Sequence, residues 1–233
     1  MCKLQQNKIV KNPLVSIIIL VYNAPLLTLQ TLLTLKKTKN IDYEVIVVDN
    51  NSGFITKIIL QLLFYFNYIG KLITSKENTY FAKGNNIGAS YCEAKSKYCL
   101  LLNSDIKIIN PNWLSLMLKN HKYGITSIGI CNKNTPIARC DGYCFLIDKD
   151  LYDKYKLDEN YKWWYSITKL QAQVLNHKNC FVGGCEDDST LIKHYWGGSG
   201  KAFKKVLTRL PEKELESWFS NTINKFQEQP KYK

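Results

Sequence analysis

The first hundred residues alternate between short apolar runs and stretches whose apolar residues recur at helical spacing. Residues 15–21, VSIIILV, form a β-branched run without polar alternation, which is typical of a strand buried on both faces of a parallel sheet. The pattern predicts strands over 15–21, 43–48, 72–74 and 98–102, with helices over about 26–35, 55–66 and 85–94 between them. This βαβαβαβ order predicts an α/β fold with a mostly parallel central sheet flanked by helices, in which ligands bind beyond the carboxyl ends of the strands.

The second half of the chain has a mixed pattern. It predicts a helix over 111–118, strands over 127–131 and 144–147, a helix over 167–175 and a last helix over 212–226. No internal repeat and no linker rich in Pro, Gly or Ser divides the chain. We therefore expect one domain over residues 1–233.

Polar clusters follow the predicted strands at the edge where ligands are expected. Asp49, Asn50 and Asn51 come after 43–48, and a carboxylate there can accept hydrogen bonds from a ribose hydroxyl or a base N–H. Short polar residues also cap the helices that follow strands, so a purely structural role is the alternative. Residues 78–88 combine two glycines with a lysine and three amides, which indicates either a ligand loop or a glycine-containing turn.

A third cluster, Asn103-Ser104-Asp105, follows the strand over 98–102. A carboxylate at that position is suited to a divalent cation that bridges two phosphates. One carboxylate makes an incomplete site, and His194 is the candidate for a second ligand, which suits manganese better than magnesium. An isolated histidine with a structural role is the alternative.

The charge balance favours phosphorylated or polyanionic partners. The chain has 32 Lys and Arg against 19 Asp and Glu, a formal net charge of +13. A nucleic-acid-binding protein is one class with this balance, but the sequence has no helix-turn-helix, zinc-finger or aromatic RNA-binding signature. We therefore expect no nucleic-acid partner, whereas a nucleotide diphosphate, an anionic membrane surface and a basic surface kept only for solubility all fit this balance.

The apolar runs and the cysteines indicate in which compartment the protein is expected and whether it contacts a membrane. No apolar run is long enough to span a bilayer, and we read no signal peptide, so the eight cysteines are expected to be reduced in a cytoplasmic protein. The tail over 204–233 places apolar residues among lysines and is expected to be helical. It could lie on a membrane or a partner, although packing against the domain is favoured.

Four segments taken in order resemble glycosyltransferase family 2, with rhamnosyltransferase-like members nearest. They are VSIIILVYN at 15–23, VVDNNS at 47–52, NTYFAKGNNIG at 78–88 and LLLNSD at 100–105. The resemblance is close over 14–118 and looser over 139–200. It implies a Rossmann-like GT-A fold with a nucleotide-sugar-binding half over 14–118, a mixed acceptor-side half over 119–203 and the tail over 204–233.

The resemblance also implies an activity and residue roles. The activity would be transfer of a hexose or deoxyhexose from a nucleotide diphosphate-sugar donor to a hydroxyl of a glycan or glycoconjugate, with Mn2+ or Mg2+ as cofactor. Asn103 stands in place of the first carboxylate of the family's Asp-x-Asp motif, which leaves Asp105 to meet the metal, and His194 matches a late histidine that helps to bind metal or diphosphate. Residues implied to bind the donor are Tyr22, Asn23, Asp49 and Asn51 around the base and ribose, and Asn78, Lys83, Asn86, Asn103 and Ser104 along the rest of the pocket.

The chain departs from the family at the general base. The family's acidic pair should fall near 165–168, where this sequence reads YSIT, and an inverting transfer needs a base within reach of the acceptor hydroxyl. Candidate bases are Glu186, Asp187 and Asp188, with Asp141, Asp158 and Glu159 as further candidates, and a solvated acidic turn is the alternative for each. A retaining or substrate-assisted mechanism remains open, as does a non-catalytic module that binds a nucleotide sugar or a glycan.

Overall fold

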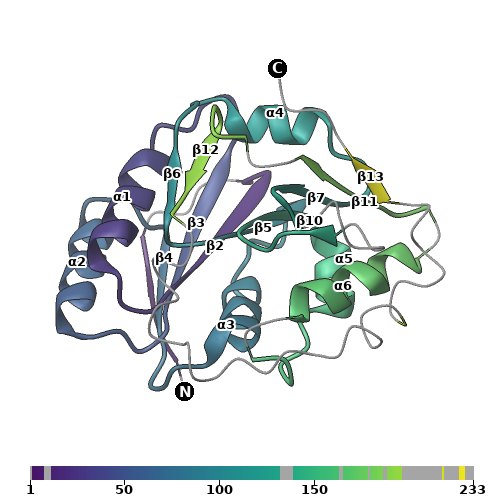
Figure 1. Ribbon diagram of the computed structural model, residues 1–233. Coiled ribbons are helices and arrows are strands. Elements are labelled where there is room, and N and C mark those ends of the chain that lie inside the picture. Colours follow the sequence, from purple (N-terminus) through teal and green to yellow (C-terminus); the bar gives the residue numbers. More distant parts are fainter. Residues whose placement is uncertain are drawn as a thin grey trace.

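A computed structural model describes residues 2–7, 12–131, 139–162, 165–177, 179–185, 188–195, 217 and 226–228. Within these residues nine strands form one sheet, in the order β1-β4-β3-β2-β5-β10-β7-β11-β13 (Figure 1). Their bounds are β1 (Lys3–Gln6), β2 (Val15–Val21), β3 (Tyr43–Asp49), β4 (Lys71–Thr74), β5 (Tyr98–Leu102), β7 (Gly124–Ile128), β10 (Cys144–Asp148), β11 (Phe181–Cys185) and β13 (Phe226–Glu228).

The sheet is parallel from β4 to β5, with β1 antiparallel to β4 at its edge, and mixed in its second half. β2 pairs in parallel with β3 and β5, and β3 pairs in parallel with β4. β10 runs antiparallel to β5 and β7, whereas β11 is parallel to β7. The prediction of an α/β fold with a mostly parallel sheet and a mixed second half is confirmed.

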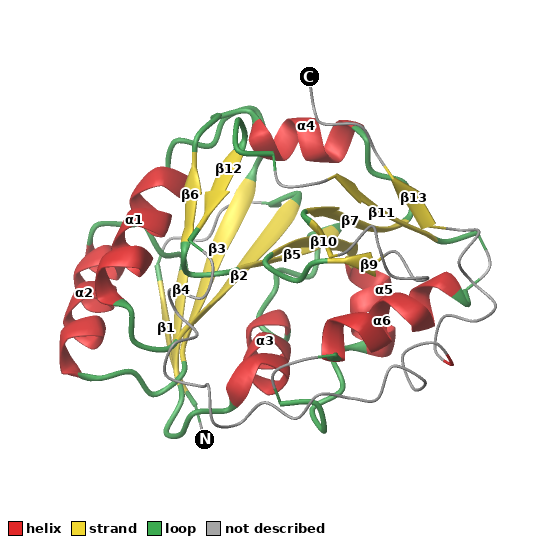
Figure 2. Ribbon diagram, in the orientation of Figure 1, coloured by secondary structure: helices red, strands yellow, loops and turns green. Residues whose placement is uncertain are grey.

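Helices cover both faces of the sheet (Figure 2). α1 (Pro25–Leu35), α2 (Phe54–Tyr65) and α4 (Trp113–Lys119) lie on one face, and α3 (Tyr80–Ala89), α5 (Lys149–Tyr155) and α6 (Ser166–Leu175) on the other. Alternation along β2 divides the core between them, because Ile17 and Ile19 pack with α1 and α2 while Ile18 packs with α3. A strand buried on both faces is what its unbroken apolar run predicts.

The helix predicted over 85–94 is displaced. α3 begins at Tyr80 and ends at Ala89, so most of the predicted ligand loop over 78–88 is helical. Two glycines explain why this helix lies so close to the sheet. A Cβ on Gly88 would lie 2.5 Å from Ile18 Cγ2, and one on Gly84 would lie 2.4 Å from Leu20 Cδ1. These glycines therefore serve close helix–strand packing.

The strand predicted over 127–131 is divided at Gly129, which has a φ of +105°. β7 ends at Ile128, and β8 (Ile130–Cys131) pairs with β9 (Arg139–Cys140) in a separate two-stranded sheet. A second small sheet joins β6 (Ile106–Ile108) to β12 (Ile192–His194) in antiparallel register. Short strands of this kind carry too little local pattern to be predicted.

The tail contributes to the fold where it is described. β13 extends the sheet by pairing in parallel with β11, so this part of the tail packs against the domain. The helix predicted over 212–226 otherwise lies outside the described residues, apart from Ser217. None of the helices in the described part of the chain is long and apolar enough to cross a membrane.

Candidate functional site

The carboxyl ends of β2, β3 and β4 meet at one edge of the sheet. Val21 and Asp49, the last residues of β2 and β3, are paired in register. The next residue, Asn50, donates its N–H to Val21 O at 2.8 Å, and Ser75 donates its N–H to Asp49 O at 2.9 Å. The loops that follow these strands are therefore adjacent, as expected for a parallel sheet.

The loop after β2 is strained and held by the loop after β3. Asn23 and Ala24 have φ values of 58° and 54°, in the left-handed region that non-glycine residues rarely adopt. Asn23 Oδ1 accepts the Gly53 N–H at 2.8 Å, and its own N–H donates to Ser52 Oγ at 3.0 Å. Backbone strain of this kind is kept where the surrounding structure over-determines it, often at ligand sites.

Asp49 braces the same turn with one of its two oxygens. Asp49 Oδ1 accepts the Ser52 N–H at 2.8 Å, and the side chain is buried. This contact matches the structural role that was the alternative for Asp49. Its Oδ2 takes no hydrogen bond from the part of the chain that the structure describes, which leaves one carboxylate oxygen for a ligand N–H or O–H. Asn51, at the exposed corner of the turn, has a φ of 64°.

Asn50 links the β3 loop to the start of α3, a role that sequence reasoning missed. Its Oδ1 accepts both the N–H and the hydroxyl of Thr79 at 2.7 Å, and its Nδ2 donates to Asn78 Oδ1 at 2.8 Å. Asn78 Oδ1 also accepts the N–H of Tyr80, which has a φ of 61°. The signal available in the sequence was its position beside Asp49 in a strand-end cluster.

Two predicted donor residues on α3 have different surroundings. Lys83 is half exposed and lies 3.9 Å from Glu77, so its ammonium group faces solvent at this edge. Asn86 accepts hydrogen bonds from the Tyr152 hydroxyl at 2.9 Å and the Leu157 N–H at 3.1 Å, and its Nδ2 donates to Leu157 O at 2.8 Å. Asn86 therefore holds α3 against the segment that follows α5, and these contacts give its predicted place in the donor pocket no support.

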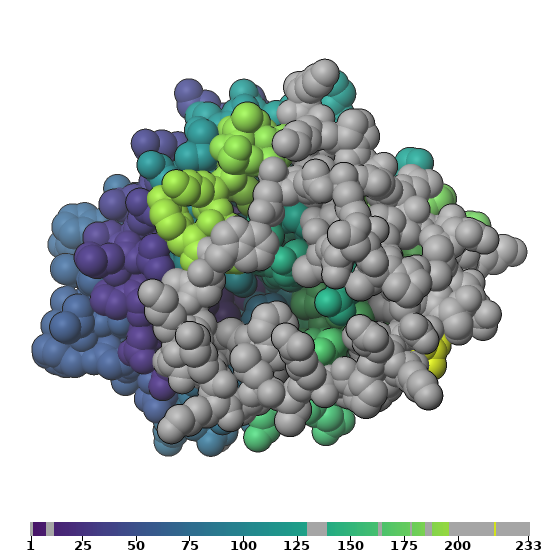
Figure 3. All heavy atoms as spheres, viewed as in Figure 1, coloured from purple at the N-terminus to yellow at the C-terminus, as the bar shows by residue number. Residues whose placement is uncertain are grey.

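The structure brings Asp105 and His194 together across 89 positions of sequence. His194 Nε2 lies 3.3 Å from Asp105 Oδ1, and the exposed fractions of the two side chains are 8% and 1%. The antiparallel pairing of β6 with β12 places His194 opposite Ile106, the residue after Asp105. The His194 ring stacks on Tyr143, with centroids 4.2 Å apart and planes 22° apart. Figure 3 shows the yellow-green surface of 188–195 beside the purple surface of α1.

The backbone around Asp105 is held by side-chain and main-chain contacts. The Thr31 hydroxyl can donate its one hydrogen to Ile106 O at 2.7 Å or to Ser104 O at 2.9 Å, and its oxygen accepts the Ile106 N–H at 3.1 Å. Tyr195 donates its N–H to Asp105 O at 3.0 Å. Thr31 and Tyr143 carried no sequence signal as site residues, because a threonine in an apolar helix and a tyrosine before a strand are common core residues.

The donor atoms of this pair fit a divalent cation. A carboxylate oxygen suits magnesium or manganese, and an imidazole nitrogen beside it favours manganese. No third histidine, cysteine or carboxylate joins the pair within the residues that the structure describes. Further oxygen ligands would come from phosphate and water, which is how such ions are usually held beside nucleotides.

The predicted bases are only partly described. Glu186 and Asp187 lie outside the described residues. Asp188 is buried, and its Oδ1 accepts the N–H and the hydroxyl of Thr190 at 3.0 and 2.5 Å, so it stabilises the turn before β12. At 165–168, which holds no carboxylate in the sequence, α6 begins with Ser166 fully buried.

The further candidates make local contacts as well. Asp158 pairs with Lys169: burial raises the pKa of its carboxyl, but the hydrogen bonds from Lys169 and Asn160 outweigh burial and leave it below 3.8. Glu159 accepts a hydrogen bond from Asn86 at 3.1 Å, and Asp141 Oδ1 accepts the N–H of Gly142 at 2.7 Å. None of these contacts places a carboxylate beside Asp105.

Solved glycosyltransferases share this fold. A mannosyltransferase, PcManGT from Pyrobaculum calidifontis, in complex with GDP-Man and Mn2+, matches with a TM-score of 0.59 and 16% identity over 70% of this chain and 53% of that one. TarS residues 1–349 from S. aureus, in complex with UDP-GlcNAc, match with a TM-score of 0.62 and 16% identity over 91% of this chain and 72% of that one. The same TarS segment with UDP matches with a TM-score of 0.56 and 18% identity over 71% and 56%.

These likenesses establish the GT-A fold. This chain spans about half the length of the mannosyltransferase, 53%. No protein with a curated description matches the sequence. The sequence profile described as Glycosyl transferase family 2 matches residues 16–207, which is most of the chain and includes every predicted donor and metal residue. The chain therefore belongs to glycosyl transferase family 2.

Proposed function

We propose that this chain is a metal-dependent glycosyltransferase. It transfers a hexose or deoxyhexose from a nucleotide diphosphate-sugar to a hydroxyl of a glycan or glycoconjugate. The observation that carries the proposal is the buried contact between Asp105 and His194, 3.3 Å apart, at the sheet edge where the Asp49 loop also ends. Family membership over 16–207 supports the same reaction class, and the nucleotide sugars bound to the matching structures fit the donor.

Different residues at this edge are proposed to bind different parts of the donor. Asp49 Oδ2, together with Tyr22, Asn23 and Asn51, receives the base and ribose through hydrogen bonds. Asn103 and Ser104 lie directly before Asp105 in the chain and are proposed to contact the donor. Asp105 and His194 would hold the cation, which would supply positive charge to a diphosphate leaving group. Lys83 adds an exposed cation at the same edge.

The acceptor side supplies the base in this proposal. Asp187 and Glu186 are the favoured candidates for the base that takes the acceptor proton if the transfer inverts. Asp188 is less suited, because its Oδ1 already accepts two hydrogen bonds from Thr190. The donor half over 14–118 and the acceptor half over 119–203 remain proposed divisions of one cytoplasmic domain.

One observation favours a second candidate function. The segment 165–168 holds no carboxylate, and its Ser166 is buried rather than presented to a ligand. A chain of this kind could bind a nucleotide sugar or a glycan without transferring the sugar. Both functions predict binding of a nucleotide-sugar donor or a glycan. Only the transferase predicts that the sugar is transferred.

A panel of nucleotide sugars separates them. Each donor is tested with Mn2+, Mg2+ or a chelator, and thermal stability and donor hydrolysis are both measured, because a donor that binds only the folded state raises the melting temperature. We expect metal-dependent stabilisation and slow hydrolysis with one donor, and loss of both in Asp105→Asn and His194→Ala. Stabilisation without hydrolysis or transfer to any acceptor would favour the binding module, and no stabilisation by any donor would contradict both.

The matched control is Asp42→Asn. Asp42 is an exposed carboxylate at the opposite edge of the sheet, before β3, and has no part in the proposed site. It should leave donor stabilisation unchanged. A loss of stabilisation in this variant equal to that of Asp105→Asn would show a general charge effect instead of a metal site.

A further inference from the structure

Helix α2 presents an apolar face to solvent. Its buried residues are Thr56, Leu60 and Leu63, which pack toward the sheet. The exposed large side chains on and directly after the helix, with their exposed fractions, are Phe54 (78%), Ile55 (66%), Ile58 (43%), Leu62 (52%), Tyr65 (76%) and Phe66 (63%). These six define what we call the α2 face.

The α2 face is one continuous stripe. At about 100° per residue, its members fall within an arc of roughly 120°, on the side of the helix opposite Leu60 and Leu63. Applying the exposed fractions to roughly 150–250 Å² per large side chain gives an apolar area on the order of 700 Å². The largest apolar patch on a typical monomer is about 300–600 Å². The apolar area of the α2 face exceeds that range, which is typical of a surface that binds a partner or a membrane.

The charges around the α2 face are mostly positive, and Glu44, which lines the pocket beside Lys36, is buried and paired with Lys71 at 3.1 Å. Residues 22–41 and 50–76, which contain α1 and α2 and their flanking loops, include no aspartate or glutamate. Lys36, Lys37 and Lys39 are exposed at the end of α1, and Lys57 lies on α2 itself. Figure 1 shows α2 on the outer side of α1, at one end of the molecule.

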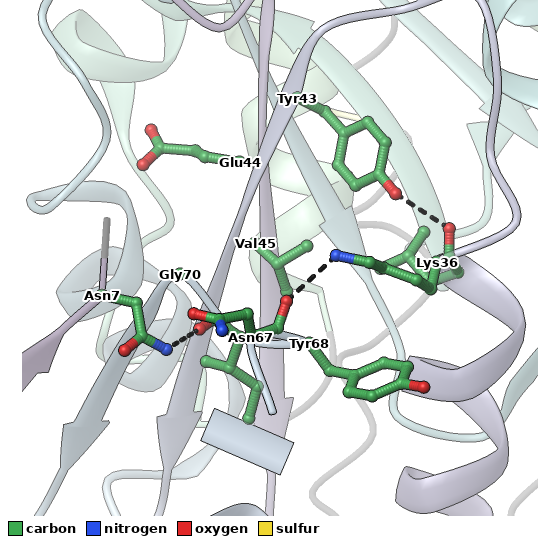
Figure 4. Close-up of a pocket in the computed structure, with 10 residues that line it drawn as sticks. Asn7, Lys36, Tyr43, Glu44, Val45, Asn67, Tyr68 and Gly70 are labelled. Carbon is green, nitrogen blue, oxygen red and sulfur yellow. Dashed lines mark hydrogen bonds between the residues drawn. The ribbon is translucent and has the colours of Figure 1, made fainter. Parts of the chain in front are cut away.

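One of these lysines is fixed beside the end of α2. Lys36 Nζ donates to Asn67 O at 3.1 Å and lies 5.8 Å from the centre of the Tyr68 ring. Figure 4 shows these groups in a pocket of about 400 Å³ at the amino edge of the sheet, where Tyr43 also donates to a carbonyl of α1. The cation is thus held at Asn67 and Tyr68, which directly follow the α2 face in the chain.

We propose that the α2 face docks on an anionic membrane surface. An apolar helical stripe with lysines beside it, and with no acid within 22–41 or 50–76, matches the requirements of an interfacial helix. Such a helix buries its apolar side at the headgroup boundary and pairs its lysines with lipid phosphates. A second copy of the chain fits less well. A two-fold contact would pair this surface with itself and bring lysines toward lysines without a carboxylate to offset them.

The inference also orients the proposed site. Phe54 and Ile55 follow directly after the turn that Asp49 and Asn23 brace, so the start of the α2 face adjoins the donor edge of the sheet. Docking through this face would hold the donor site next to the bilayer. An acceptor anchored in the membrane would then reach it without leaving the lipid.

Vesicle flotation of the full chain tests the proposal. The probes are vesicles of phosphatidylcholine alone and of phosphatidylcholine with phosphatidylglycerol. We expect binding to the anionic vesicles. Ile58→Ser should lower the partition coefficient about fivefold, and the double variant Phe54→Ser/Tyr65→Ser about a hundredfold, because each change removes apolar surface that the membrane would bury. All three side chains are exposed, so the variants should fold, which circular dichroism would verify.

Ile109→Ser is the matched control, since Ile109 is 44% exposed against 43% for Ile58 and lies outside α1 and α2. It should bind vesicles as the unchanged chain does. Equal loss in Ile58→Ser and Ile109→Ser, or full binding by the double variant, would overturn the proposal. So would a chain that ignores vesicles but, by light scattering, is a dimer that the double variant converts to a monomer. Donor stabilisation in solution should be the same in all these variants, which separates this test from that of the proposed function.

Discussion

Two threonines on one helix permit a direct test of how the Asp105 segment is held. Thr28 and Thr31 are both fully buried on α1, one turn apart. Thr31 Oγ1 accepts the Ile106 N–H and donates its one hydrogen to Ile106 O or Ser104 O, whereas Thr28 Oγ1 has no hydrogen-bond partner among the described residues. Replacing each by valine removes the hydroxyl while it keeps nearly the same shape.

The expected effects differ in sign. Thr31→Val leaves the Ile106 N–H and one backbone carbonyl without this partner in the core. Each unsatisfied buried group costs about 1–3 kcal/mol, so we expect a loss of about 2–4 kcal/mol in the free energy of unfolding. For a chain of this size that lowers the melting temperature by roughly 5–15 °C. Thr28→Val removes a buried hydroxyl that has no partner, so the protein should be unchanged or more stable by about 1 kcal/mol.

Urea denaturation measures both variants, with the midpoint expected to move and the slope to stay the same. Donor-dependent stabilisation of the folded Thr31→Val protein should also weaken, because Asp105 lies between the two residues that Thr31 holds. The reasoning fails if Thr28→Val costs as much as Thr31→Val, or if Thr31→Val unfolds within about 0.5 kcal/mol of the unchanged chain.

Two further predictions concern packing and charge. Gly88→Ala should cost about 1–3 kcal/mol in the free energy of unfolding, since its Cβ would lie 2.5 Å from Ile18 Cγ2, and an unchanged urea midpoint would show that α3 can move away. The lowered pKa of Asp158 stabilises the fold above pH 3.8, and this contribution is lost as the pH falls below that value. In Lys169→Met, the free energy of unfolding should therefore decrease less steeply as the pH is lowered. Lys83→Met, which removes a pairing of 3.9 Å between exposed groups, should leave the acid limb unchanged, and equal flattening in both variants would argue against a specific pair.

The donor half was predictable because its signals are local. The apolar runs of β2, β3 and β5 identify buried parallel strands without reference to the rest of the chain. The start of α3 was not predictable in the same way. Asn50 makes the contacts with Asn78 and Thr79 that precede the helix, and it comes from another strand, so the local pattern around residues 78–88 lacked the deciding residue.

The sequence pattern also did not show which sides of α2 are buried. Its sequence, FITKIILQLLFY, is apolar almost all round, which periodicity reads as a helix buried on every side. The tertiary structure buries only the side that meets the sheet and leaves six large apolar side chains in solvent. Whether an apolar helix is covered depends on its neighbours, and α2 lies beside α1 at one end of the molecule (Figure 1).

The sequence by itself determined the α/β class, the family and the polar residues at the strand ends, because each of these depends on residues close together along the chain. Only the tertiary structure decided which distant residues meet. The pairing of β6 with β12 brings His194 to Asp105, and Thr31 of α1 holds the backbone on either side of that carboxylate. Such contacts depend on how strands pair and helices pack, since hydrogen bonds between distant segments form only when the core places both partners together.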